Sequence, residues 1–125
     1  MSFKFFPDEE FQRIGSDPEK MNQVFMEKLI ELRFTLGEPL PLNSAWRSVP
    51  RNTKVGGAKN SPHLYGKAVD LRVHGDVAFH VVSMAEQFGF TGVGVQQKGP
   101  VANRFIHLDD MEFSDTHYRP SIWSY

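Results

Sequence analysis

Two short segments of the chain carry most of the side chains that could do chemistry. In the first, residues 60–70, His63 ends a stretch rich in Gly and Pro, and functional side chains are common on such loops. Gly66 permits a tight turn. Asp70 follows within the apolar run AVDLRV, where a carboxylate is costly to bury unless it pairs with a cation or binds a metal. Both polar residues are therefore candidates for a functional site.

The second segment is residues 105–110. In a β-strand, His107 and Asp109 lie on one face, whereas Ile106 and Leu108 lie on the other. Two His and one Asp from these segments make a three-ligand set with a position open for water, as in catalytic zinc sites. Nitrogen and oxygen donors suit Zn²⁺ without thiolates, and the chain has no Cys.

Simpler interpretations also fit these residues. Asp70 could form an ion pair with Arg47 or Arg72. Asp109 could cap a turn together with Asp110. Three further histidines lack a comparable context and are expected on the surface or in the core: His74, His80 and His117. Residue types and spacing alone therefore leave a metal site and an ordinary polar cluster both open.

The apolar pattern predicts two helices. The first, residues 17–36, has Asp17 as its N-cap and ends at Gly37. Apolar residues recur in it every third or fourth position: Met21, Phe25, Leu29, Leu32 and Leu36. The second, residues 76–88, has Asp76 as its cap and ends at Gly89.

Four strands are predicted at residues 40–46, 68–73, 92–95 and 104–109. The loop of residues 47–65 is long for a compact domain, and such loops are more often functional than idle. Residues 96–103 resemble a hairpin-type connection. The order of elements predicts an α+β domain with a central antiparallel sheet and helices packed on one side.

Composition excludes several classes of protein. The 125 residues, 40% hydrophobic and 23% charged, suit one globular domain and not a disordered chain. Fourteen Lys and Arg stand against 15 Asp and Glu, so no nucleic-acid partner is expected. No stretch approaches the ~20 apolar residues of a membrane helix, and the N-terminus lacks the apolar run of a signal peptide. We therefore expect cytoplasmic synthesis and no membrane partner.

Several ordered motifs resemble a known family. The pattern SxHxxGxAxD at residues 61–70, followed by HxD at 107–109, is similar to the D-Ala-D-Ala carboxypeptidase family of zinc peptidases, which cleave peptidoglycan peptides. It looks closest to the small single-domain members found in bacteria and tailed phages. Matching blocks at residues 44–48, 52–58 and 92–95 extend the resemblance over about residues 20–111.

The resemblance implies a site and a fold. One Zn²⁺ per chain would be bound by His63, Asp70 and His107. Arg47 would hold a substrate carboxylate or carbonyl, which suits the rigid guanidinium. Ser61 would hydrogen-bond near the ligands or the substrate. Residues 1–125 would form a single peptidase domain, with a fold similar to the hedgehog N-terminal domain.

One departure from the family concerns the general base. Many members have an acidic residue three positions before the last zinc His, and some have a His two positions before it. Here these positions hold Arg104 and Phe105. Asp109 is the nearest carboxylate and shares a face with His107, so it is the candidate base. An equal alternative is that Asp109 orients a ligand. Three later residues would be considered next: Asp110, Glu112 and His117.

The sequence therefore favours a zinc metallopeptidase, an endopeptidase or carboxypeptidase acting on peptidoglycan stem peptides or cross-links. The expected setting is a monomeric phage endolysin that reaches the cell wall after holin-type release. One alternative is a bacterial D,D-carboxypeptidase of cell-wall remodelling. A second, favoured by Arg104, is a zinc-binding module without activity, and a third is a small α+β binding domain without metal.

Overall fold

The computed structural model describes residues 2–125. Its α-helices are α1 (Asp8–Arg13), α2 (Gln23–Leu36), α3 (Val49–Lys54) and α4 (Gly75–Met84). Its strands are β1 (Leu42–Ser44), β2 (Ala68–Leu71), β3 (Gly92–Gln96), β4 (Phe105–Asp109) and β5 (Ser121–Ser124). Three short 3₁₀ turns complete the chain: η1 (Pro18–Lys20), η2 (Pro62–Tyr65) and η3 (Val101–Asn103).

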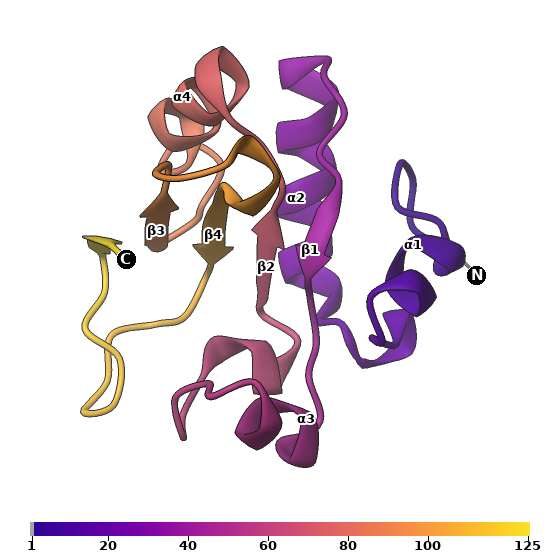
Figure 1. Cartoon of the computed structure of the whole chain (residues 1–125), viewed down its shortest axis with the longest axis vertical. Coiled ribbons are helices and arrows are strands. Elements are labelled where there is room, and N and C mark those ends of the chain that lie inside the picture. The colour runs from indigo at the N-terminus through magenta and orange to yellow at the C-terminus, as the bar shows by residue number, and fades with distance from the viewer. Residues whose placement is uncertain (1) are drawn as a thin grey trace.

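The five strands form one sheet in the order β1-β2-β4-β3-β5. Neighbouring strands are antiparallel except β3 and β5, which are parallel. In Figure 1, α1 lies beyond the β1 edge, whereas the C-terminus lies at the opposite edge, beside β3. The predicted α+β class and the antiparallel centre are confirmed. The prediction missed β5, whose parallel pairing makes the sheet mixed.

Alternation along the two central strands gives the sheet two different faces. Val69 and Leu71 of β2, with Ile106 and Leu108 of β4, join the hydrophobic core. That core also contains residues of α2 and α4: Phe25, Met26, Leu29, Leu32, Ala78 and Val81. These two helices therefore pack on one side of the sheet, as predicted. The polar residues between the core positions point to the other face, and α3 lies near the start of β2 in Figure 1.

The first predicted helix is wrong at its start. Asp17 does cap a helix, since its carboxylate accepts the Glu19 N–H, but that helix is the 3₁₀ turn η1. The chain turns extended at Met21, and α2 begins after Asn22, whose side chain accepts the Phe25 N–H. A backbone hydrogen bond from Asn22 to the carbonyl of Gly66 holds this break. A partner so distant in sequence was not visible in the local pattern.

The second helix is also displaced. It spans Gly75–Met84, and His74 occupies the cap position without a side-chain cap. Asp76 is not the cap, because its carboxylate accepts the N–H of the next residue, Val77, inside the first turn. The four predicted strands correspond to β1–β4, but β1 is only three residues long. Within residues 2–125, no helix is long and apolar enough to cross a membrane.

Candidate metal centre

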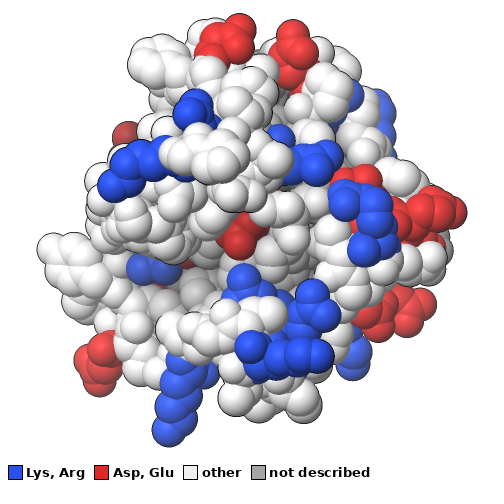
Figure 2. Space-filling model, in the orientation of Figure 1, with Lys and Arg blue, Asp and Glu red and all other residues white. Residues whose placement is uncertain are grey.

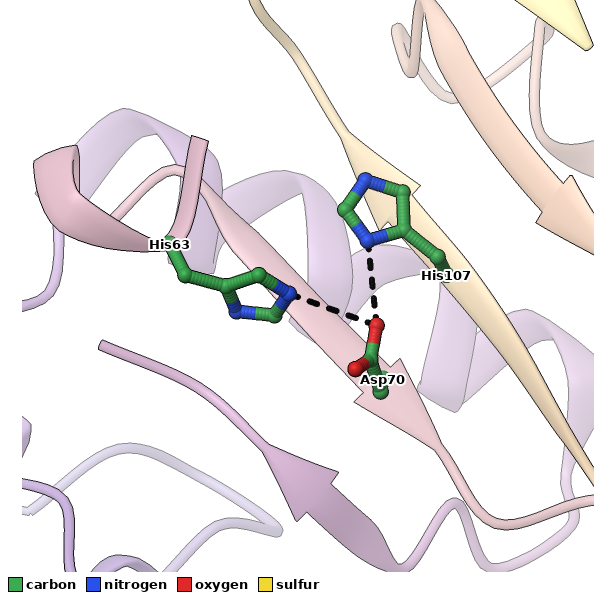
Figure 3. A group of neighbouring side chains, drawn as sticks. All are labelled: His63, Asp70 and His107. Atoms are coloured by element: carbon green, nitrogen blue, oxygen red, sulfur yellow. Dashed lines mark hydrogen bonds and ion pairs between the residues drawn. The ribbon is translucent and has the colours of Figure 1, made fainter. Parts of the chain in front are cut away.

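Three separate elements bring His63, Asp70 and His107 together (Figure 3). His63 lies in η2, and Ser61 caps this turn by accepting the His63 N–H at 3.2 Å. Gly66 ends the turn with φ +66° and allows β2 to begin at once. Asp70 of β2 is the cross-strand partner of His107 in β4, so their side chains leave the sheet next to each other. All three side chains are buried.

One carboxylate oxygen is common to both histidines. Oδ1 of Asp70 lies 3.0 Å from Nδ1 of His107 and 3.4 Å from Nε2 of His63. One possible ligand atom from each of the three residues lies within 4.8 Å of the other two. The sequence-predicted ligands therefore converge on one point.

Hydrogen bonds behind the rings determine which nitrogens face that point. Nδ1 of His63 lies 2.7 Å from the carbonyl oxygen of Ala45 and must donate to it. Nε2 of His107 lies 2.7 Å from Oδ2 of Asp109. With these donors used, neutral rings direct lone pairs toward the Asp70 oxygen. Three acceptors facing one another repel unless a cation lies between them, so the donor set fits a metal ion with two nitrogen ligands and one oxygen ligand.

Electrostatics also favours a cation here. Burial by itself would raise the pKa of Asp70, but the electrostatic and hydrogen-bond interactions with His63 and His107 outweigh burial and hold that pKa well below its ordinary value. Burial lowers the pKa of His107, but hydrogen bonds to Asp109 and Asp70 and the charges of both carboxylates give a net increase. The cluster thus keeps its carboxylate ionised and attracts positive charge.

Asp109 lies behind His107 and is fully buried. Arg119 donates to it through two nitrogens, Nε to Oδ1 at 2.8 Å and Nη2 to Oδ2 at 2.7 Å. Burial would raise its pKa, but hydrogen bonds from His107 and Arg119 lower the pKa to about 2. Gly92, its neighbour on β3, leaves room for this pair, because a Cβ there would collide with both carboxylate oxygens.

Arg47 is held at the edge of the cluster by three contacts. Its Nε donates to Ser44 Oγ at 3.2 Å, and its Nη1 donates to Asn52 Oδ1 at 3.1 Å. Its Nη2 lies 3.7 Å from Oδ2 of Asp70, so the ion pair considered from the sequence is present as well. Asn52 is itself fixed by donating to the carbonyl of Ala58 at 2.8 Å. The guanidinium is therefore fixed in place before any ligand binds.

A cavity of about 380 Å³ opens over the three candidate ligands. Arg47, Ser61, Phe105, Trp123 and Tyr125 are among its other lining residues. Among the residues that the structure describes, Asp70 supplies the one carboxylate side chain of this lining. On the face seen in Figure 2, acidic atoms lie in a central hollow, with Lys and Arg side chains along its lower border.

The remaining sequence candidates lie outside this cavity. Asp110 is bound by Lys28 at 2.9 Å and approached by Lys67 at 3.7 Å. His117 is buried, but its Nε2 bonds to the carbonyl of Asn60. Glu112, His74 and His80 are exposed. Of these acidic candidates, Asp109 is the one that contacts the cluster, through its hydrogen bond with His107.

Sequence reasoning missed three residues at the site, namely Arg119, Trp123 and Tyr125. The Trp123 ring lies 5.2 Å from the His107 ring and 5.1 Å from the Arg119 guanidinium, measured between centres. Alternation of Trp123 and Tyr125 at the C-terminus was the available signal, since strands often alternate in this way. Gly92 and Gly94 gave another signal, because two positions without side chains on one face of a strand leave room for neighbouring side chains.

Comparisons with known proteins identify the family of the chain. The family model of peptidase M15 matches residues 6–109. The zinc D-Ala-D-Ala carboxypeptidase of Streptomyces albus G is 39% identical over 71 residues, which cover 56% of this chain and 28% of that protein. The probable peptidoglycan L,D-endopeptidase MepK of Haemophilus influenzae is 34% identical over 98 residues, covering 72% of this chain and 50% of that protein. The chain thus spans half or less of the length of these curated relatives, and the family match confirms the resemblance seen in the motifs.

Proposed function

Because the chain belongs to the peptidase M15 family, we propose that it is a zinc metallopeptidase that hydrolyses peptide bonds in peptidoglycan. The observation that carries this proposal is the convergence of lone pairs from His63, Asp70 and His107 at the floor of an open cavity. Both relatives named above carry peptidase names: one name includes zinc and D-Ala-D-Ala, and the other includes peptidoglycan. Stem peptides and their cross-links are the substrate class that follows.

Zinc is the proposed metal, one ion per chain. Nε2 of His63, Nδ1 of His107 and a carboxylate oxygen of Asp70 would hold it, which leaves a position for water or substrate. A bound zinc ion supplies a Lewis acid for the peptide carbonyl and activates water near neutral pH.

Arg47 is the proposed anchor for the substrate. Its guanidinium lies at the border of the cavity and is already oriented by Ser44 and Asn52. A planar, fixed guanidinium binds a carboxylate or carbonyl with less loss of side-chain entropy than a lysine would. Ser61 is the second proposed substrate contact. Its oxygen accepts the His63 N–H, and its hydroxyl proton can still be donated into the cavity.

For Asp109 we propose the orienting role in preference to the role of general base. Its two oxygens are occupied by His107 and by both prongs of Arg119, and it does not line the cavity. A base must come within hydrogen-bond reach of the proton that it removes, directly or through one water. Asp109 instead sets the direction of the His107 ring, as carboxylates behind metal-bound histidines do.

Digestion of purified peptidoglycan tests the activity. Protein loaded with zinc should release peptide fragments that mass spectrometry identifies, and removal of zinc by a chelator should stop the release. The fragments also distinguish an endopeptidase from a carboxypeptidase, since only a carboxypeptidase releases a single terminal residue. Bound zinc without any fragment from several wall types would instead support the non-catalytic module that Arg104 suggests.

The proposed setting is lysis of a phage-infected cell, in line with the resemblance to small members from tailed phages. A peptidase made inside the cell needs a membrane opening, such as a holin, to reach the wall. Expression in a bacterial host should therefore cause lysis only after the inner membrane is permeabilised with chloroform. Unchanged turbidity after permeabilisation, with activity on that host's purified wall, would favour the bacterial remodelling enzyme.

A further inference from the structure

The C-terminal strand β5 (Ser121–Ser124) lies outside the matched residues 6–109 but borders the cavity. Its partner in the sheet is β3, where Gly94 is opposite Trp123 on one side and opposite His107 on the other. One glycine therefore separates a candidate metal ligand from the C-terminal strand. Because Gly94 has no side chain, side chains from β5 can extend over it toward His107.

Tyr125 uses that space. A Cβ on Gly94 would lie 2.8 Å from the phenol oxygen of Tyr125 and 2.7 Å from Nε1 of Trp123, so both groups lie over the Gly94 backbone. The backbone N–H of Tyr125 donates to Val95 at 3.3 Å, and its ring lies 5.1 Å from that of Phe105. These contacts hold the phenol oxygen above β3, the strand that lies between β5 and the strand of His107, β4.

The Tyr125 hydroxyl has a proton to donate. The indole N–H of Trp123, which can only donate, lies beside the phenol oxygen over Gly94. A phenol can both accept and donate, so accepting from the indole leaves its own proton available to another acceptor. Tyr125 lines the cavity and about half of its surface is exposed, so a ligand can reach it. Burial of the other half raises the pKa of the phenol, which keeps it protonated at neutral pH.

The order of the strands places Tyr125 opposite Arg47. Arg47 follows β1 at one edge of the sheet, and Tyr125 follows β5 at the other edge. Asp70 and His107 lie on β2 and β4 between these edges. A peptide that crosses the metal cluster from the arginine therefore passes over the end of β5.

We propose that Tyr125 donates a hydrogen bond from its phenol hydroxyl to a carbonyl oxygen of the substrate peptide, on the side of the metal cluster opposite Arg47. This inference rests on the proposed peptidase function and adds a contact from a segment beyond the family match. The substrate would then be held at both ends of the cavity, by a guanidinium at one end and by a neutral donor at the other.

Tyr125→Phe tests the proposal, with Tyr118→Phe as the matched control because Tyr118 is 74% exposed and does not line the cavity. The kinetic substrate is a soluble stem pentapeptide ending in D-Ala-D-Ala, or the muropeptide that the wall digest identifies. Loss of one hydrogen bond should lower kcat/KM about tenfold in Tyr125→Phe, mainly through KM, and leave Tyr118→Phe unchanged. Zinc content and Tm should equal those of the wild type.

A second readout does not depend on turnover. The chain has three tyrosines, so protein with ¹³C-labelled tyrosine rings gives few NMR signals, and Tyr125→Phe identifies one of them. Product peptide should shift the Tyr125 signal and leave the Tyr118 signal in place. Equal kcat/KM in the two variants, an unmoved Tyr125 signal, or loss of zinc from Tyr125→Phe would overturn the proposal. A wild type that cleaves no peptidoglycan peptide would overturn the proposed function and this inference with it.

Discussion

Nε2 of His107 lies 2.7 Å from Oδ2 of Asp109, on the side of the ring away from Asp70. This bond leaves Nδ1 of His107 facing the cluster. Arg119 holds the same carboxylate with two hydrogen bonds, so the direction of the His107 ring depends on a chain of three side chains. The last of them lies ten residues beyond the family match, which makes the C-terminal segment part of the candidate metal centre.

The Asp109→Asn variant separates the two roles considered for this carboxylate. If Asp109 orients His107, zinc affinity should fall roughly 10–100-fold while turnover at saturating zinc stays mostly intact. If it were the general base, turnover at saturating zinc should fall by roughly two or more orders of magnitude. Turnover measured over a range of free zinc concentrations distinguishes these results, and we expect the first.

The contacts of Asp109 with His107 and Arg119 should make folding sensitive to acid. The pKa of Asp109 is lowered from 3.8 to about 2 in the folded protein, so the unfolded chain takes up the proton first as pH falls. The contribution of the ionised carboxylate, with His107 and Arg119 as its partners, is about 2 kcal/mol; it is complete above about pH 4 and is lost as pH falls toward 2.

Urea unfolding of zinc-free protein between pH 2 and pH 6 measures this contribution. Asp109→Asn has no carboxylate to titrate at this position, so the difference in unfolding free energy between wild type and variant should shrink as pH falls. A difference that stays constant over this range would show that the ionised Asp109 carboxylate does not stabilise the fold.

Gly92 should be required because Asp109 occupies the space where its side chain would be. A Cβ at this position collides with both carboxylate oxygens, and Arg119 prevents the carboxylate from moving aside. Gly92→Ala should therefore reduce the unfolding free energy by roughly 1–3 kcal/mol and weaken zinc binding. In an Asp109→Ala background the same change should cost much less. Equal costs in the two backgrounds would mean that this contact is not the cause.

The central strands were predictable because their signals are local. Apolar residues alternate with Asp70 in β2 and with His107 in β4, so the sequence itself indicates which side chains share a face. Residue types suggested the two histidines and Asp70 as a ligand set, but only the ordered motifs favoured that set over an ordinary polar cluster, since nothing in their spacing states that β2 and β4 are neighbours. Antiparallel pairing then places Asp70 beside His107.

The misplaced elements depend on contacts between distant residues. The break before α2 is held by the carbonyl of Gly66, more than forty residues later in the chain. Strand β5 pairs in parallel with β3, and the roles of Trp123 and Arg119 come from that pairing. A four-residue edge strand gives a weak pattern by itself. Such tertiary contacts are not encoded in hydrophobic periodicity, so local reasoning could not have placed them.

The metal assignment is tested by removing His63. His63→Ala takes away one nitrogen ligand and should lose most of the zinc from the purified protein, as measured by elemental analysis. His80→Ala is a suitable control, because His80 is exposed on α4. It should keep one zinc per chain. Stoichiometric zinc in His63→Ala would show that the ligand set is wrong.

The role of Arg47 is tested by Arg47→Lys, which keeps the charge. Lysine lacks the planar guanidinium. Its single nitrogen cannot replace the three separate contacts that Arg47 makes with Ser44, Asn52 and Asp70. We expect kcat/KM to fall at least tenfold, since charged two-pronged hydrogen bonds contribute roughly 1.5–3 kcal/mol. Zinc content should stay at one per chain, because Arg47 is not a ligand.

Arg51→Lys is the matched control, as Arg51 is exposed on the neighbouring helix α3 and points toward Gly15. It should retain wild-type kinetics, and an equal fall in both variants would indicate that the positive charge near the cavity matters more than the shape of the Arg47 guanidinium.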